Sequence, residues 1–276
     1  MGRLLFVAAM LMLSAGAAFA ADEPRIVSMN VCTDQLLLSL ADPHQILGLS
    51  RFARDSWQSF AAGEAREFPV LSGGAEDVLM LKPDVVVASL FDKRSTRDLL
   101  KAQGLPLAEF SVAQTLDEVK AQIGRMGEIA GHPDRAMAEI AYLESAVARA
   151  RESASGRNDR VLALSRRGWV SGRASLLGSL LDVAGLRNAA DELGIGSGGY
   201  ASLEAIIALK PDLLVVSEAG DRAEDEGKAF LLHPALERFY PSDKRIVIPE
   251  RLTVCGGVML ADALDLLVKE LKRVTR

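Results

Sequence analysis

EDVLMLKPDVVVAS, residues 76–89, is closely matched by EAIIALKPDLLVVS, residues 204–217. Both stretches begin with a glutamate, share Leu-Lys-Pro-Asp and end, after an apolar run, in a serine, at a constant offset of 128 (204 − 76 = 128). Proline disfavours helix in the residue before it, so each stretch predicts a helix that ends there. The apolar run that follows is typical of a strand buried on both faces. The same helix–strand unit is therefore predicted twice, half a chain apart.

The segments around the two copies also follow one order. Short strands are predicted at RIVSMN (25–30) and RVLALS (160–165), and each precedes a helix. The first helix covers TDQLLLSLA (33–41) with Thr33 as its cap, and the second covers SLLGSLLDVAG (175–185). Strands that alternate with helices indicate a mostly parallel, open α/β sheet. The chain is thus predicted to form two Rossmann-like α/β lobes in tandem.

A long helix is predicted between the lobes, from Pro133 to Ser155. Proline suits the first helical position, alanine, glutamate and arginine favour helix, and Gly156 suits the exit. At about 1.5 Å per residue this helix is roughly 30 Å long. The resulting boundaries are an N-terminal lobe at 21–131, a connecting helix at 132–156 and a C-terminal lobe at 157–276. A stiff connector predicts lobes at a nearly fixed distance, with a ligand cleft between them.

The first twenty residues have the pattern of a signal peptide. Arg3 precedes an apolar core from Leu4 to Leu13, and the segment ends in Ala18-Phe19-Ala20. This pattern predicts cleavage before Ala21 and export, with the periplasm as the location. The alternative is a membrane anchor, but the strongly apolar run is shorter than the roughly 20 residues that span a bilayer.

The charge balance argues against one class of partner. The 276 residues carry a formal net charge of −5, which becomes −6 when cleavage removes Arg3 (−5 − 1 = −6). A mildly acidic chain with scattered charges gives no reason to expect binding to nucleic acid or to an anionic membrane.

Cys32 and Cys255 are the two cysteines of the chain, and each is predicted just before a helix near the cleft. Three interpretations remain open: a disulfide that clamps the lobes, two free thiols in the pocket, or a pair of soft metal ligands. Export favours the disulfide. The bond needs Cα atoms within about 7 Å, which the sequence alone does not establish.

Two further stretches complete a pattern that covers essentially the whole mature chain. PRIVSMNVCTDQLLLSL (24–40) opens the first lobe and WVSGRASLLGSLLDVAGLRN (169–188) opens the second. Together with the matched stretches, in this order and spacing, they resemble the class III, helical-backbone periplasmic binding proteins that deliver iron–siderophores, haem or cobalamin to ABC importers. The resemblance implies a monomeric protein that is not an enzyme and holds no cofactor or metal of its own. It implies two partners, a small-molecule metal complex and an inner-membrane ABC permease.

The resemblance also assigns a role to the two leading glutamates. In the family, one surface glutamate of each lobe docks onto basic residues of the permease, and the matching residues are Glu76 and Glu204. Paired carboxylates on two rigid lobes recognise arginines at a fixed separation. The alternative is that each glutamate only favours its helix, because negative charge is stabilised in a first helical turn.

Loops beyond the carboxyl ends of the strands are where an open α/β sheet binds its ligand. Ten aromatic and arginine residues in these loops are predicted to line the ligand site: Phe52, Arg54, Trp57, Phe91, Arg94, Arg166, Arg167, Trp169, Tyr200 and Arg251. About half are expected to touch ligand, with the others on a solvated rim or in packing. Guanidinium groups pair with oxygen anions and stack on rings, so a flat anionic ligand is predicted, a ferric siderophore or haem. Cobalamin is the alternative. The positions that form an aromatic wall in the cobalamin binders of this family are only partly aromatic here, with Phe52 and Tyr200 retained, which counts against cobalamin.

An exported hydrolase is the alternative from another class. It needs an activated nucleophile and a base, but His44, His132 and His233 stand in contexts typical of helix boundaries. The sequence has no Gly-x-Ser-x-Gly elbow. Three scattered histidines also argue against a zinc or manganese carrier, and neither lobe has, after its first strand, the Gly-rich turn of a dinucleotide-binding site.

Overall fold

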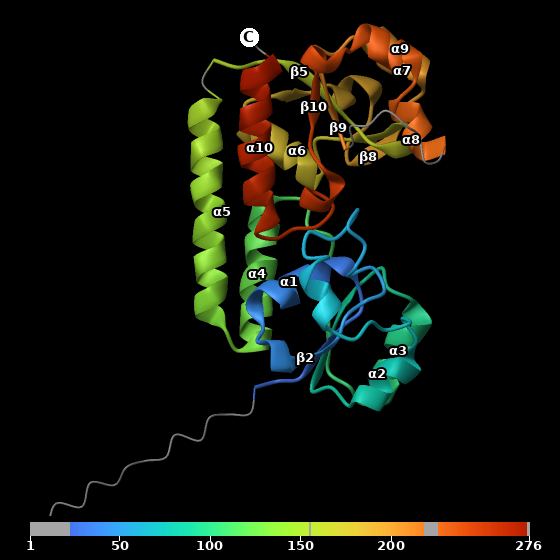
Figure 1. Ribbon diagram of the computed structural model, residues 1–276, viewed down its shortest axis with the longest axis vertical. Coiled ribbons are helices and arrows are strands. Elements are labelled where there is room, and N and C mark those ends of the chain that lie inside the picture. Colours follow the sequence, from blue (N-terminus) through green and yellow to red (C-terminus); the bar gives the residue numbers. More distant parts are fainter. Residues whose placement is uncertain (1–22, 155, 218–225, 275–276) are drawn as a thin grey trace, which may run out of the picture.

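Two β-sheets lie at opposite ends of an elongated molecule, and three long helices run alongside them (Figure 1). The computed structural model describes residues 23–154, 156–217 and 226–274. The predicted signal peptide and its cleavage site before Ala21 fall outside these residues. Within the described ranges, no helix has both the length and the apolar character needed to cross a membrane. The predicted α/β class with two lobes is confirmed.

The sheet of the N-terminal lobe is entirely parallel, with the strand order β2-β1-β3-β4. Its strands are β1 (Ile26–Ser28), β2 (Ile46–Gly48), β3 (Val85–Ser89) and β4 (Leu107–Phe110). Its helices are α1 (Val31–Leu40), α2 (Ala75–Leu81) and α3 (Arg94–Ala102), with short 3-10 turns η1 (Pro43–Gln45) and η2 (Glu64–Glu67). Val86 and Val87 of β3 pack into different hydrophobic clusters. The strand is therefore buried on both faces, as its unbroken apolar run predicts.

The sheet of the C-terminal lobe is mixed, with the order β10-β9-β5-β6-β8 and β7 paired with β5. Its strands are β5 (Arg160–Leu164), β6 (Trp169–Ser171), β7 (Arg187–Asn188), β8 (Gly198–Tyr200), β9 (Leu213–Val216) and β10 (Arg245–Val247). Its helices are α6 (Leu176–Val183), α7 (Leu203–Leu209), α8 (Glu226–Leu231) and α9 (Pro234–Phe239), and its 3-10 turns are η3 (Arg166–Gly168), η4 (Ala189–Leu193), η5 (Ser242–Lys244) and η6 (Glu250–Leu252).

Strands β10, β9 and β5 run parallel, whereas β6 and β8 extend the sheet in antiparallel fashion. The sequence predicts only a loop after β5. A tight turn that includes Gly168, with φ 79°, instead returns the chain beside β5. This antiparallel edge brings Trp169 to the side of the lobe that faces its neighbour.

The two matched stretches form the same local structure. Helices α2 and α7 are each seven residues long, and each is followed by a lysine with a left-handed backbone, Lys82 (φ 48°) and Lys210 (φ 49°). The next residue in each copy is proline, which disfavours right-handed helix at the lysine. The predicted helix stop is confirmed in both lobes.

The aspartate that follows each proline ties the unit to the first strand of its lobe. Asp84 accepts the backbone N–H of Arg25 at 2.8 Å, and Asp212 accepts that of Arg160 at 2.7 Å. Each arginine also donates its guanidinium N–H groups to carbonyls at the end of the adjacent helix, α2 or α7. These carbonyls have no partner within their helix, so a cationic donor there stabilises the helix end. Leu-Lys-Pro-Asp is therefore scaffold.

Three helices form one layer beside both sheets: α4 (Leu116–Ala130), α5 (Pro133–Ser153) and α10 (Met259–Val274). The connecting helix predicted from Pro133 is observed as α5, and it packs against both α4 and α10 (Figure 1). One continuous hydrophobic cluster joins Ile26 of the first sheet, Leu143 of α5 and Ile246 of the last strand. The lobes thus share a core in addition to a connector, which restricts their relative movement.

Helix α1 begins two residues earlier than the sequence predicts, and Asn30 caps it instead of Thr33. The Asn30 Oδ1 accepts the backbone N–H groups of Cys32 (3.0 Å) and Thr33 (3.1 Å). The prediction of Thr33 as the cap was wrong, because its hydroxyl is already paired with Ser28 Oγ at 2.7 Å in the buried first turn. Asparagine is as strong a cap as threonine or stronger.

Candidate functional site

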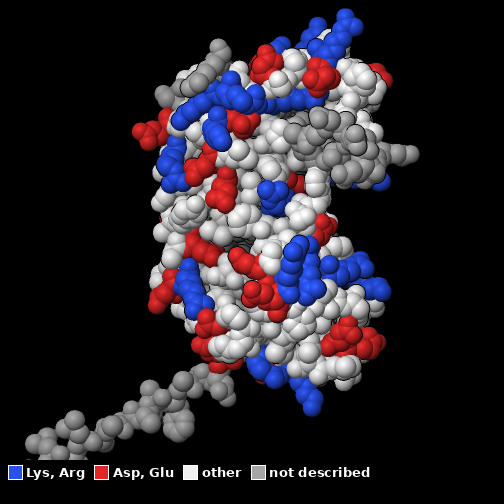
Figure 2. Space-filling model, in the orientation of Figure 1, with Lys and Arg blue, Asp and Glu red and all other residues white. Residues whose placement is uncertain are grey.

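A cavity of about 460 Å³ lies where the C-terminal lobe faces the N-terminal lobe. Its C-terminal walls include the carboxyl ends of β5 and β9, at Leu164 and Val216, where the ligand site of an open α/β sheet is expected. Its other wall is the segment Val112–Gln114, which follows β4. We call this space the main cavity. Figure 2 shows that the molecule narrows between its two lobes on the side away from α5.

A second, smaller pocket of about 60 Å³ adjoins the main cavity in the N-terminal lobe. Val112, Ala113 and Val254 line both spaces. The closing serines of the two matched stretches lie one in each: Ser89 lines this N-lobe pocket and Ser217 lines the main cavity. The repeated unit therefore contributes to the site through its last residue in both lobes.

Hydroxyl groups provide most of the polarity of the main cavity. They belong to Ser165, Ser171, Ser175, Ser197, Ser217 and Thr253. Ser165 and Ser217 share a hydrogen bond of 3.3 Å, and Ser175 caps α6. Within the described part of the chain, the hydroxyls of Ser171, Ser197 and Thr253 make no hydrogen bond. They are available to a ligand.

Charge is nearly absent from the lining of both spaces. Of the described lining residues, Glu250 alone carries a charged side chain. The remaining walls are apolar, with Leu176 and Val215 as examples. An uncharged ligand that accepts and donates hydrogen bonds suits such a lining, whereas an anionic group would meet a carboxylate and no cation among the described lining residues.

Trp169, in the lining of the main cavity, takes part in one aromatic contact, and a neighbouring arginine takes part in another. Trp169 lines the cavity and meets Tyr200 edge-on, with ring centroids 5.1 Å apart. Gly198, which is opposite Ser171 on β8, leaves room for the indole of Trp169, since a Cβ there would stand 2.4 Å from it. Arg166 of the C-terminal lobe lies over Trp57 of the N-terminal lobe, 5.5 Å from the ring centroid. This cation–π contact crosses from one lobe to the other.

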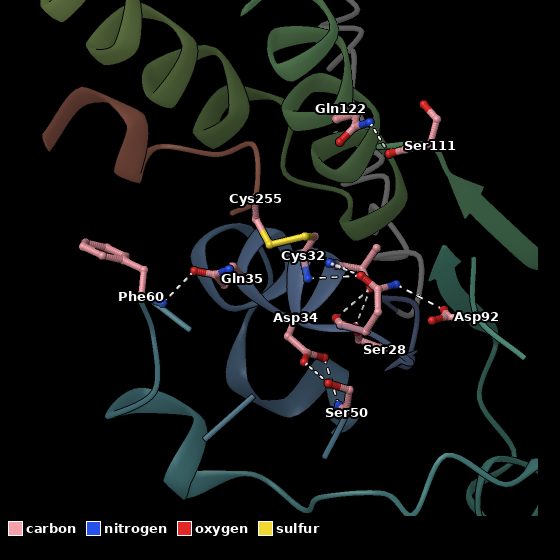
Figure 3. The surroundings of a disulfide bond; sticks show 12 residues. Ser28, Cys32, Asp34, Gln35, Ser50, Phe60, Asp92, Ser111, Gln122 and Cys255 are labelled. Atoms are coloured by element: carbon pink, nitrogen blue, oxygen red, sulfur yellow. Dashed lines mark hydrogen bonds between the residues drawn. A yellow bond between two sulfur atoms is a disulfide. The ribbon is translucent and has the colours of Figure 1, made fainter. Parts of the chain in front are cut away.

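The two cysteines are bonded to each other. Cys32, in the first turn of α1, and Cys255, in the loop before α10, have Cα atoms 5.2 Å apart and form a disulfide that lines the N-lobe pocket (Figure 3). Of the three interpretations left open by the sequence, the disulfide is confirmed; free thiols and soft metal ligands are excluded. The bond links the N-terminal lobe to the C-terminal segment that carries Val254.

A buried carboxyl group lies beneath the disulfide, on the same helix. Asp34 is fully buried and accepts hydrogen bonds from the backbone N–H (3.0 Å) and hydroxyl (2.5 Å) of Ser50 (Figure 3). Burial raises the pKa of Asp34 from 3.8 to about 6, although the hydrogen bonds from Ser50 and Ser28 oppose the rise. The protein therefore takes up a proton here at a pH at which the unfolded chain does not.

Asp34 is expected to make the protein more stable as the pH falls from 7 to 4. Because its folded pKa of about 6 exceeds the ordinary 3.8, its contribution is fully present below about pH 4 and is lost as the pH rises through 6. The contribution is on the order of 3 kcal/mol. Urea unfolding gives the free energy of unfolding of the wild type and of Asp34→Asn at pH values between 4 and 7. The contribution of Asp34 is the change, over this pH range, in the difference between these two free energies. A difference that does not vary with pH would contradict the assignment, and the exposed Asp243→Asn is the matched control.

The structure places one of the ten predicted ligand residues, Trp169, in the lining of the main cavity, and Tyr200 stands against it. Trp57 and Arg166 contact each other from opposite lobes and are not among the described lining residues of either space. Arg54 is engaged elsewhere, because its guanidinium donates to the backbone carbonyls of residues 65, 66 and 68. It holds the segment between β2 and α2 in place.

The other predicted residues are exposed and do not line either space. Arg94, at the start of α3, pairs with Asp98 at 3.5 Å, and Phe91 is 79% exposed. Phe52 lies under the guanidinium of Arg51, 4.7 Å from the ring centroid. Arg167 and Arg251 are exposed neighbours of lining segments. Contacts of these residues with a ligand remain predictions.

Sequence reasoning missed the hydroxyl groups and the Val112–Gln114 segment. A signal for two of the serines was present, since each closes a copy of the matched stretch at the carboxyl end of a strand. The prediction named arginine and aromatic side chains instead, because charge and ring stacking indicate a class of ligand more specifically than a serine hydroxyl does.

The two leading glutamates occupy equivalent positions. Glu76 is the second residue of α2 and Glu204 the second of α7, and both are exposed. The backbone N–H of Glu204 itself, and then the Ser202 hydroxyl, hold the pKa of Glu204 below its usual range. Figure 2 shows that acidic and basic side chains are mixed on the face of both lobes that it displays.

The histidines lie at element boundaries, as their sequence contexts predict. His44 is in η1 and pairs with Glu23 at 2.9 Å, while His132 and His233 occupy the N-cap positions of α5 and α9. None of the three lines the main cavity. Glu23, Asp42 and His44 could together approach a metal ion, but Asp42 is paired with Arg135 at 2.7 Å, and a neighbouring guanidinium opposes a cation.

Comparison with known proteins places this geometry among relatives. Residues 26–248 match the signature of the family described as periplasmic binding protein. Two proteins described as cobalamin-binding, from two strains of Halobacterium salinarum, are 26% identical to the chain over 227 residues. These matches cover 78% of the chain, and the chain spans 60% of the length of those relatives.

Solved structures with the same arrangement include the apo periplasmic haem-binding protein RhuT from Roseiflexus sp. RS-1, with a TM-score of 0.75 and 25% identity over 92% of this chain and 100% of that one. A periplasmic haem-binding protein from Pseudomonas aeruginosa has a TM-score of 0.72 and 22% identity, covering 89% of this chain and 91% of its own. An Fe3+-hydroxamate transport protein from Saccharomonospora viridis has a TM-score of 0.70 and 19% identity, covering 90% and 93%. At these identities the last two show a shared fold alone.

Proposed function

Because the chain belongs to the periplasmic binding protein family, we propose that it is the substrate-binding component of an ABC importer and carries an uncharged metal complex to an inner-membrane permease. The observation that carries the proposal is the main cavity between the lobes, with its hydroxyl-rich walls and Glu250 as the one charged side chain of its described lining. Capture and release require no bond to be made or broken. A hydrolase lacks support here, since the histidines lie away from the cavity.

The lining favours a ligand without anionic groups. The propionates of haem and the catecholates of many siderophores need cationic partners, and a buried oxygen anion left without one costs several kcal/mol. The described lining offers no such partner. It also contains no histidine, methionine or tyrosine that could bind the haem iron directly. These points argue against the anionic ligand that the arginine-rich loops suggest.

A corrinoid is the ligand class that we favour. Corrinoids carry peripheral amides, which both donate and accept hydrogen bonds and thus complement the free hydroxyls of Ser171, Ser197 and Thr253. The relatives from Halobacterium salinarum, described as cobalamin-binding, support the same class. Ferric hydroxamate siderophores are the second candidate, because they lack net negative charge and present carbonyl oxygens to the same hydroxyls.

A binding panel tests the proposed ligand class on the chain from Ala21 to Arg276. The panel contains cyanocobalamin, a ferric hydroxamate, haemin and a ferric catecholate, and calorimetry and quenching of tryptophan fluorescence follow binding. Trp169, in the cavity, reports directly on occupancy. We expect cyanocobalamin to bind at least 100-fold more tightly than haemin and the catecholate. Tight binding of haemin without binding of cyanocobalamin would overturn the proposed class, and turnover of an ester or peptide would overturn the binding function itself.

A charge placed in the cavity provides the matched control for the panel. Ser217→Arg adds a cation at the end of β9. It should lower the ratio of the affinity for cyanocobalamin to the affinity for haemin by about tenfold or more. Ser39→Arg, at an exposed position of α1, adds the same charge outside the cavity and should leave the preference unchanged.

A further inference from the structure

We propose that the N-lobe pocket is a subsite for one uncharged amide arm of the ligand, and that Gln122 selects an amide over a carboxylate there. The proposal rests on the proposed function, since it assumes a ligand with amide arms in the main cavity. It concerns a separate set of residues on the other lobe. The two spaces communicate past Val112 and Val254, which line both.

The size and polarity of the N-lobe pocket fit a small neutral group. Its volume of about 60 Å³ exceeds the space that one water needs and is too small for a ring system. None of its described lining residues is charged; its polar members are Asn30, Thr33, Ser89, Ser111 and Gln122. A carboxylate arm in this pocket would lose its hydration without gaining a cationic partner.

The side-chain amide of Gln122, on α4, is held in one orientation. Its Nε2 donates to the backbone carbonyl oxygen of Ser111 at 2.8 Å (Figure 3). A carbonyl oxygen can only accept, so the NH2 end of the glutamine must face Ser111. The Oε1 is then the end left to the pocket, and an oxygen acceptor attracts the N–H of an amide and repels a carboxylate.

Serine hydroxyls provide the complementary donors. The Ser89 Oγ accepts the backbone N–H of Phe91 at 3.1 Å, which leaves its own proton for a ligand oxygen. The Ser111 hydroxyl makes no hydrogen bond among the residues that the structure describes, although its carbonyl is engaged by Gln122. One acceptor and two hydroxyl donors can pair with one N–H group and with both lone pairs of the carbonyl oxygen of a primary amide.

The remaining walls are fixed before any ligand arrives. The Oδ1 of Asn30 accepts the hydrogen bonds that cap α1, and its Nδ2 donates to Asp92 at 3.2 Å. The disulfide forms another wall, and Gly256 beside it packs so closely that a Cβ would stand 2.6 Å from Val119. A preformed pocket loses little entropy on binding, so a single arm can add usefully to selectivity.

The test compares cyanocobalamin with its derivatives in which one peripheral amide has been hydrolysed to a carboxylic acid. For the wild-type protein, we expect at least one monoacid to bind tenfold or more weakly than the parent compound. Gln122→Lys should reverse this preference for that same monoacid, because a cation now faces the carboxylate. Gln122→Leu should bind parent and monoacid equally, since it removes the acceptor. Thermal unfolding of each variant, followed by circular dichroism, checks that it is folded.

Gln103→Lys is the matched control, because Gln103 is also a glutamine but is exposed at the end of α3 and lines neither space. It should not reverse the preference for the monoacid that identifies the subsite. If all monoacids bind as tightly as cyanocobalamin, or if the two lysine variants act alike, the subsite is wrong while the proposed function stands. If the wild type binds no corrinoid at all, the proposed ligand and the subsite both fail.

Discussion

Replacing Glu76 and Glu204 together by lysine is expected to reduce import to background while leaving ligand affinity unchanged. We propose both residues as docking groups for the permease, one on each lobe. They occupy the second position of two equivalent seven-residue helices on lobes that share a core, so their separation is set by the fold. Loss of one partner from a charge pair that is buried and hydrogen-bonded in an interface costs about 2–5 kcal/mol, and docking on the permease would bury these exposed carboxylates. Each single reversal should therefore weaken docking at least tenfold.

Uptake of radiolabelled ligand by cells or vesicles that contain the cognate permease measures the effect. The control is the double variant Glu128→Lys and Glu152→Lys, which changes the net charge equally at exposed positions of α4 and α5. It should import normally. If the two glutamates only stabilise their helices, each reversal should lower the free energy of unfolding by about 1 kcal/mol and leave transport intact. Normal import by the Glu76/Glu204 double variant would thus refute the docking role.

Removal of the disulfide is expected to have the largest effect on stability. The bond closes a loop with a sequence separation of 223 residues, and chain-entropy arguments assign about 5 kcal/mol to a loop of this length. Cys32→Ser with Cys255→Ser should lower the free energy of unfolding by about 2–5 kcal/mol. The double variant should still fold, because the hydrophobic core shared by the lobes remains.

Urea unfolding at pH 7 measures the change as a shift of the transition midpoint. A reductant should shift the midpoint of the wild type by a similar amount and have no effect on the double serine variant, which controls for the substitution itself. A loss of less than 1 kcal/mol would contradict the clamp. Ligand affinity should also fall, because Val254, which precedes Cys255, lines both the main cavity and the N-lobe pocket.

The sequence predicts the framework well because the framework depends on local rules. A proline stops a helix and an apolar run forms a buried strand wherever they occur, so the matched stretches and α5 are found where they are expected. The antiparallel strands β6 and β8 are missed because they are short and depend on a turn at Gly168. The cap of α1 is misassigned because two polar residues compete for it and burial decides between them.

The site is predicted less well because it depends on which way side chains turn in the folded protein. The guanidinium of Arg54 donates hydrogen bonds to three backbone carbonyls, and the sequence around Arg54 does not predict these contacts. Cys32 and Cys255 are far apart in sequence, so only the fold shows that their Cα atoms lie 5.2 Å apart. Serines such as Ser171 carry no distinctive signal, and their importance comes from the scarcity of other polar groups around them.

The layer of α4, α5 and α10, together with the disulfide, also bears on the kinetics of delivery. Because the two lobes are joined through one core and one covalent bond, we expect them to change shape little when cargo arrives. Under the proposed function, the transporter then meets nearly the same outline whether the carrier is full or empty. The ligand-free protein would bind the permease as readily as the ligand-bound protein. The rate of import would then depend on the ratio of bound to free protein as well as on the concentration of ligand. An excess of carrier over cargo would therefore slow import.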